Sequence, residues 1–150
     1  MANPHESALH YPFGDALPAT GTTLEVAPGV RWLRMPLPFA LDHINLWLLH
    51  DRLDGVDGWS VVDCGVTSDA TRAAWEQVFA TQLQGLPVLR VMVTHMHPDH
   101  IGLAHWLCER WSTAGDPGAS AGVGDCRLWI SATDWNAARI SSQSTTRSEE

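Results

Sequence analysis

Four residues whose side chains can bind metal ions lie within six positions, in the run HMHPDH at residues 95–100. They are His95, His97, Asp99 and His100. The apolar segment 88–93 comes directly before this run, and apolar residues at helical spacing follow it. A strand entering the run and a helix leaving it would hold the four side chains on a short loop. Imidazole nitrogens and carboxylate oxygens are the ligands of hydrolytic zinc sites, so the run predicts a metal centre.

Size and composition predict one globular domain. The chain has 150 residues, 45% of them hydrophobic, and its 8 tryptophans can build a core. A formal net charge of −8 without any cluster of arginines argues against nucleic-acid binding. No apolar run approaches the roughly 20 residues that span a bilayer, and signal-peptide features are missing. The 3 cysteines form no C-x-x-C pair, which argues against a disulfide framework. We therefore expect a cytoplasmic protein that binds neither nucleic acid nor membrane.

Local patterns divide the chain into three parts. Residues 1–21 are rich in Pro, Gly and small residues and predict an N-terminal arm, residues 22–140 carry the periodic segments, and residues 141–150 form a polar tail. Strands are expected at 30–35, 44–49, 59–63, 88–93 and 127–130, with Asp-Gly turns at 54–55 and 57–58. Helices are expected at about 67–84, at about 100–111, and from Ser131 onward, where Asp134 completes a capping pattern.

The order of these elements, a meander followed by strand–helix–strand and then HMHPDH, resembles the metallo-β-lactamase superfamily. The segment VVDCG at residues 61–65 resembles the strand-end Asp-x-Gly of that family. The resemblance covers residues 22–140. It implies an α/β (α+β) fold, the αββα sandwich, of which this chain would supply the first αβ half, a mixed sheet with flanking helices.

The resemblance also implies roles for individual residues. His95 and His97 would bind a first zinc ion, and Asp99 and His100 a second. Asp99 would further hold and orient the attacking water, as a catalytic residue, and Asp63 would support the metal loop from behind. One or two zinc ions are expected, although the same ligands also accept iron or manganese.

This sequence departs from the family pattern downstream of the motif. Family members use a third histidine for the first zinc, a bridging aspartate and a last histidine, but no histidine follows His105 here. Two interpretations stay open. The first is a zinc-dependent hydrolase that attacks the thioester or lactone carbonyl of a small-molecule substrate, similar to hydroxyacylglutathione hydrolases. The second is a truncated, non-catalytic chain that binds at most one metal and acts as a partner-binding or vestigial half-domain.

Half of such a sandwich would leave one face of its sheet uncovered. We expect self-association or a partner through that face, because large exposed apolar patches mark interaction sites. The residues expected on it are Trp47, Leu49, Val61, Val91 and Val93.

Other motifs support rival functions. Residues 118–122 satisfy G-x-S-x-G around Ser120 but lack the strand and helix of a nucleophile elbow, so a serine hydrolase is a minor alternative. An iron-loaded oxidoreductase is another. His105 is interpreted as a solvated helix residue and His43 as a loop residue that could line a pocket. Trp106 and Trp135 are expected in the core or its edge, and either could border a substrate pocket.

Overall fold

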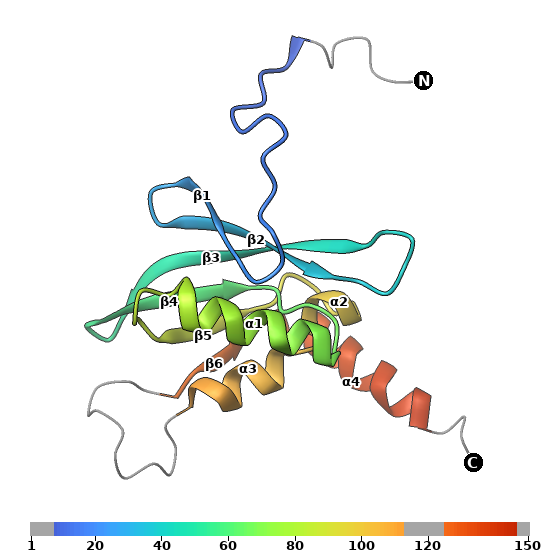
Figure 1. The fold of residues 1–150 in the computed structure, drawn as a ribbon. Helices are drawn as coiled ribbons and strands as arrows, with labels where there is room; N and C mark the ends of the chain where they lie inside the picture. Colours follow the sequence, from blue (N-terminus) through green and yellow to red (C-terminus); the bar gives the residue numbers. More distant parts are fainter. Residues whose placement is uncertain (1–7, 113–124, 147–150) are drawn as a thin grey trace.

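The computed structural model describes residues 8–112 and 125–146, which form one mixed sheet with helices beside it (Figure 1). The strands are β1 (Leu24–Ala27), β2 (Val30–Pro36), β3 (His43–Leu53), β4 (Val56–Val62), β5 (Val88–Met92) and β6 (Arg127–Trp129). The helices are α1 (Asp69–Thr81), α2 (Pro98–Ile101), α3 (Ala104–Trp111) and α4 (Ala132–Thr146).

The six strands lie in the sheet in the order of the sequence, from β1 to β6. Strands β1 to β4 pair antiparallel, whereas β4, β5 and β6 pair parallel. A parallel pair needs a crossover connection, and α1 provides it between β4 and β5. The mixed sheet with flanking helices that the sequence predicted is confirmed.

The β3–β4 hairpin turns at Asp54-Gly55, and both residues have the positive φ angles of a two-residue hairpin loop, 51° and 84°. The second Asp-Gly pair was also expected to be a turn, but Asp57 and Gly58 lie inside β4. Gly58 serves there to allow close packing. A Cβ atom at this position would lie 2.6 Å from the Pro87 carbonyl oxygen.

Helix α1 begins where the sequence predicted, with Ser68 as its N-cap: the Ser68 hydroxyl accepts a hydrogen bond from the Thr71 amide. The helix ends at Thr81, before the expected residue 84. Gln84 and Gly85 both have positive φ angles, 57° and 76°, and lead the chain into β5 instead. Strand β1 was not predicted, because four residues at a sheet edge carry little periodicity.

The helix expected at 100–111 is divided into α2 and α3 by Gly102 and Leu103. A Cβ atom at Gly102 would lie 2.4 Å from the Pro98 carbonyl oxygen and 2.8 Å from that of Gly65. The Gly102 carbonyl accepts a hydrogen bond of 2.8 Å from the Thr67 hydroxyl. This contact with the segment after β4 explains the break. Proline at the first position of α2 explains why the helix starts earlier than predicted.

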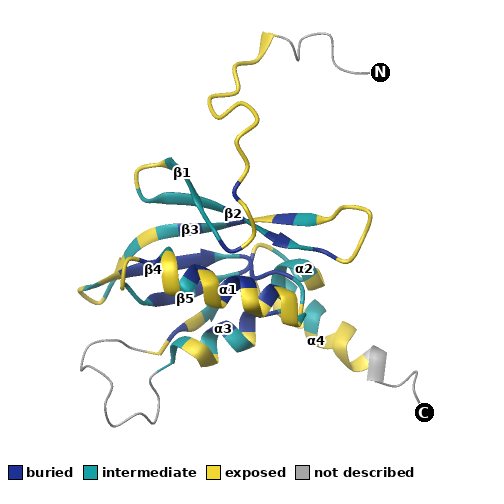
Figure 2. Ribbon diagram, viewed as in Figure 1, coloured by how far each residue is buried: buried dark blue, intermediate teal, exposed yellow. Residues whose placement is uncertain are grey.

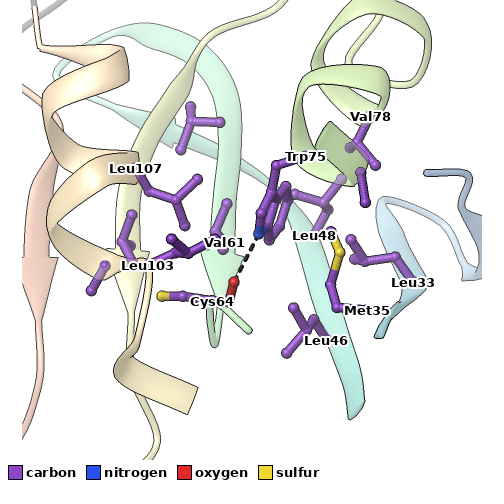
Figure 3. Close-up of a cluster of buried hydrophobic side chains, with 14 of the residues drawn as sticks. Leu33, Met35, Leu46, Leu48, Val61, Cys64, Trp75, Val78, Leu103 and Leu107 are labelled. Atoms are coloured by element: carbon purple, nitrogen blue, oxygen red, sulfur yellow. Dashed lines mark hydrogen bonds between the residues drawn. The ribbon is translucent and has the colours of Figure 1, made fainter. Parts of the chain in front are cut away.

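The hydrophobic core lies between the sheet and the helices α1 and α3, which pack on the same face (Figure 1). Trp75 of α1 is fully buried, and its indole nitrogen donates a hydrogen bond of 2.8 Å to the Cys64 carbonyl (Figure 3). The buried side chains around it include Leu33, Met35, Leu46, Leu48, Val61, Val78, Leu103 and Leu107.

The opposite face of the sheet has no helix against it in the described ranges. Trp47 and Leu49 lie on this face and are partly exposed, as predicted. Val61 and Val91 have no exposed surface and Val93 is 6% exposed, because they belong to the core on the helix side. The prediction was wrong for these three valines. Alternation shows which residues share a face, but not which face the helices cover.

The chain segments at both ends of the described structure are largely exposed (Figure 2). The described part of the predicted arm, from residue 8, is mostly exposed, although Pro18 is buried. Helix α4 extends to Thr146, so residues 141–146, expected in the polar tail, continue the helix. No helix in the described residues is long and apolar enough to cross a bilayer.

Candidate metal centre

The predicted ligands lie on the loop between β5 and α2 and on the first turn of α2. His95 follows the end of β5, and His97 is the extended residue that precedes α2. Asp99 and His100 belong to α2 itself. His97 is exposed, while the other three residues are partly buried. Strand and helix thus hold the run at both ends, as the sequence predicted.

Asp63 lies beneath this loop, at the end of β4, and is only 5% exposed. Its Oδ2 accepts a hydrogen bond from His100 Nδ1 at 2.8 Å. A histidine that donates through Nδ1 keeps the Nε2 lone pair free for a metal ion. The structure thus gives Asp63 the contacts of the supporting residue that the resemblance implied, while the metal-binding roles stay predictions.

Thr94 extends this support to a second histidine and was not singled out from the sequence. Its amide donates to Asp63 Oδ1 at 2.8 Å, and its hydroxyl lies 2.8 Å from Asp63 Oδ2. The same hydroxyl is 3.0 Å from His95 Nδ1. A hydroxyl can donate to the carboxylate and accept from the imidazole at once, which leaves His95 Nε2 free. Threonine is not a usual metal ligand, so only its position between strand and motif could have drawn attention to it.

The four candidate ligands form two adjacent pairs of donor atoms. His95 Nε2 and His97 Nδ1 face each other at 3.0 Å, and two nitrogen ligands of a tetrahedral zinc ion are about 3.3 Å apart. His100 Nε2 lies 3.6 Å from Asp99 Oδ2. The rings of His95 and His100 are in contact, with centroids 3.8 Å apart, and this places the pairs side by side.

The donors therefore fit zinc in kind and in pairwise spacing, but not in number. Within residues 8–112 and 125–146, no group of three or more His, Cys, Asp or Glu side chains is arranged to hold a metal ion. A catalytic zinc ion normally has three protein ligands. In these residues, each pair supplies only part of such a ligand set.

The strand and helix that follow α3 support the loop from its other side. The Val93 amide donates to the Trp129 carbonyl of β6 at 2.9 Å, and the Met96 amide donates to Asp134 Oδ1 of α4 at 3.3 Å. Asp134 was predicted only as a capping residue. It has that role too, since its amide donates to the Ser131 hydroxyl at 3.0 Å.

The remaining candidates lie apart from these donor pairs. His105 is exposed and lies 3.2 Å from Glu109, which confirms the solvated helix residue that was expected. His43 was expected in a loop, but it is the first residue of β3 and pairs with Pro36 of β2. It lines a shallow pocket and lies 2.6 Å from Asp42. Trp106 stacks on Phe79 at the core edge, and Trp135 borders a cavity between α3, β6 and α4. Ser120 lies outside the described residues.

Comparison with known proteins decides the family. The sequence profile of the metallo-beta-lactamase superfamily matches residues 40–121, more than half of the chain and including the whole HMHPDH run. The chain belongs to the metallo-β-lactamase superfamily.

Two solved structures and one curated relative are similar to this chain. A beta-lactamase domain protein from Burkholderia ambifaria is 58% identical, with a TM-score of 0.78 over 90% of this chain and 39% of that chain. The DIM-1 metallo-beta-lactamase, in a structure exposed to ceftazidime, is 14% identical over 85% of this chain and 50% of that chain, with a TM-score of 0.56, and shows the shared fold alone. The probable metallo-hydrolase YqjP of Bacillus subtilis (strain 168) is 33% identical over 72 residues.

The chain spans less than half the length of each of these two relatives, the Burkholderia protein and YqjP. It spans 39% of the Burkholderia chain, and its match to YqjP covers 21% of that protein and 47% of this one.

Proposed function

We propose that this chain forms part of a metal-dependent hydrolase that cleaves a thioester or lactone carbonyl. The observation that carries the proposal is the support of two histidines by one buried carboxylate, Asp63, directly to His100 and through Thr94 to His95. This network holds His100 and His95 through their Nδ1 atoms, so that the Nε2 lone pair of each ring would be available to a metal ion.

The residues of the loop have separate tasks in this proposal. His95 and His97 would hold one zinc ion, and Asp99 with His100 a second. A zinc ion bound there would lower the pKa of a coordinated water to near 7 and polarise the substrate carbonyl. Asp99, with its carboxylate beside His100 Nε2, would accept a hydrogen bond from the attacking water and orient it.

Turnover requires more donors than the described residues bring together. We propose that further ligands, supplied by an additional chain segment or by a partner, complete each pair. The relatives' greater length supports this proposal, because more than half of the Burkholderia chain lies outside the match.

Metal content after dialysis against metal-free buffer tests the proposed site. We expect the wild-type chain to retain more zinc than His95→Ala and His97→Ala, and His105→Ala, a matched control on α3, to retain as much as wild type. Thioester and lactone hydrolysis, measured with and without a chelator, then tests the reaction. Equal zinc content in all four proteins would refute the site, and chelator-insensitive activity would favour the Ser120 alternative instead.

A partner-binding function without catalysis is favoured by a different observation. One cross-strand row of apolar residues crosses the whole uncovered face of the sheet, each residue paired with the next on the neighbouring strand. The row consists of Leu24, Trp32, Trp47, Val62, Met92 and Trp129. We propose that a second copy of the chain covers this row.

The molar mass of the protein, measured by light scattering as it elutes from a size-exclusion column, tests this second proposal. We expect the wild-type chain to be at least dimeric, Trp47→Glu to be monomeric, and Ile140→Glu, changed at an exposed position of α4, to resemble wild type. Retained cooperative unfolding would show that Trp47→Glu still folds. A monodisperse wild-type monomer with a cooperative melt contradicts the proposal.

A further inference from the structure

Two of the three cysteines, Cys108 and Cys126, line one cavity that lies beyond the end of the metal-ligand run. Cys108 lies on α3, and Cys126 lies directly before β6. Both side chains line the same partly open cavity of about 570 Å³, which is also bordered by Ile101, His105 and Trp135. The Ser112 hydroxyl, just after α3, donates to the Cys126 carbonyl at 3.5 Å and ties the two segments together.

The two thiols differ in environment. Cys108 is half-buried and reaches the cavity, whereas Cys126 is 4% exposed. A hydrogen bond from the Cys126 thiol holds the pKa of Cys108 below its ordinary value, although burial opposes this. The same interaction, with burial, raises the pKa of Cys126. A thiol with a lowered pKa beside a second thiol is the arrangement of a reactive and a resolving cysteine.

We propose that Cys108 and Cys126 are a thiol-modification site, at which a peroxide closes a reversible disulfide between α3 and β6. The Cys108 thiolate attacks one peroxide oxygen, the O–O bond breaks, and a sulfenic acid forms at Cys108 with release of water after protonation. The Cys126 sulfur then attacks the sulfenic sulfur, the S–O bond breaks, and a second water leaves. Both thiols are oxidised and one hydrogen peroxide is reduced to two waters.

Such a disulfide would act on a part of the fold that holds the metal-ligand loop. The strand after Cys126 accepts the Val93 amide through the Trp129 carbonyl, and the following helix accepts the Met96 amide through Asp134. Joining β6 to α3 would restrict the motion of this support. Oxidation of the two cysteines would therefore reduce the motion of the metal-ligand loop without any chemical change to its candidate ligands.

Cys64 provides a matched control within the same chain. It is fully buried at the end of β4, and burial raises the pKa of its thiol. It borders neither the cavity nor an opening to solvent among the described residues. We expect it to stay reduced under conditions that oxidise the other two.

The arginine positions make the experiment direct. Trypsin cleavage after arginine places Cys64 in peptide 53–72, Cys108 in peptide 91–110 and Cys126 in peptide 111–127. After treatment of the full chain with one equivalent of hydrogen peroxide and alkylation of free thiols, we expect peptides 91–110 and 111–127 to appear joined. Reductant should separate them, and peptide 53–72 should carry the alkyl group.

Variants complete the test. Cys108→Ser and Cys126→Ser should each abolish the joined peptide, while Cys64→Ala should retain it, with circular dichroism showing that all three fold. In the oxidised wild type, the Val93 and Met96 amides should exchange with deuterium several-fold more slowly than in the reduced protein. A disulfide that includes Cys64, a disulfide between two chains, or free thiols at both cavity positions after oxidation would each overturn the proposal.

Discussion

Asp63 and His100, which are 37 residues apart in the sequence, are joined by a hydrogen bond of 2.8 Å between the carboxylate Oδ2 and the imidazole Nδ1. The bond crosses from the end of β4 to helix α2. It fixes which nitrogen of His100 carries a proton. A residue that follows β4 thus orients a candidate ligand that lies beyond β5.

Replacement of Asp63 by asparagine should weaken metal binding about 10–100-fold. Asparagine tolerates the left-handed backbone of this position, where φ is 61°, so the change removes charge rather than shape. Competition against a fluorescent zinc chelator measures the affinity. Asp57→Asn, at an exposed position of β4, is the control, and an affinity of Asp63→Asn equal to it would contradict the supporting role.

Replacement of Thr94 by valine should weaken zinc binding about 10-fold, and Thr94→Ser should restore it. Valine keeps the shape of threonine but lacks the hydroxyl that lies between Asp63 and His95. The same competition titration measures both variants. If valine and serine have equal effects, Thr94 contributes through packing and not through its hydroxyl.

Alanine at Gly102 should destabilise the protein by about 1–3 kcal/mol and also reduce metal retention. The added Cβ would meet backbone atoms of Pro98 and Gly65, which cannot move aside without displacing α2. Gly55→Ala is the matched control: its Cβ meets open space, but φ is 84°, so its cost of about 1–2 kcal/mol is confined to the backbone of the hairpin. Urea unfolding measures the loss of stability in each variant, and zinc content shows whether only Gly102→Ala also loses metal. Normal zinc retention in Gly102→Ala would show that the loop does not depend on this contact.

Alanine at Ser68 should reduce the free energy of unfolding by about 1 kcal/mol, because the Thr71 amide loses its acceptor at the start of α1. Ser131→Ala removes the equivalent cap of α4. Since the described side chains of α4 are mostly exposed, we expect lower helicity there with little change in the urea midpoint. Equal urea midpoints for Ser68→Ala and Ser131→Ala would contradict the expectation that α1 contributes more to stability than α4.

Acid should destabilise the fold partly through Asp51. Partial burial alone would raise the pKa of this residue, but hydrogen bonds from Ser60 and the Arg52 amide, with the charge of Arg90, bring it below its ordinary value of 3.8. A carboxylate whose pKa is lower in the folded state stabilises the protein above its unfolded pKa, and this contribution is lost as pH falls through the folded pKa. Urea midpoints measured from pH about 6 down to about 2 should therefore fall less steeply for Asp51→Asn than for wild type.

Much of the fold follows from local signals in the sequence. Alternation and Asp-Gly chemistry located β2 to β5 and the β3–β4 turn, and Ser68 located the start of α1. The break at Gly102 could not be predicted, because it depends on contact with Gly65 and Thr67, far along the chain. The side of the sheet on which Val61 and Val91 lie was predicted wrongly for a related reason. The alternation of side chains along a strand does not show which side of the sheet the helices cover.

The candidate site was predicted unevenly. Residue type and spacing identified His95, His97, Asp99 and His100, and the resemblance to a known family identified Asp63. Thr94 and the contact of Asp134 with the loop were not predicted, because both depend on hydrogen bonds between segments that are apart in the sequence. Such contacts arise only when segments distant in sequence meet.

The parallel pairing of β4 and β5 has a consequence for the order of folding. Strands β1 to β4 can pair through short connections, but β5 reaches β4 only after the crossover through α1 has closed. Asp63 and Thr94 lie just after these two strands, so they cannot meet until the crossover is complete. We therefore expect the metal-ligand loop to take its shape late in folding.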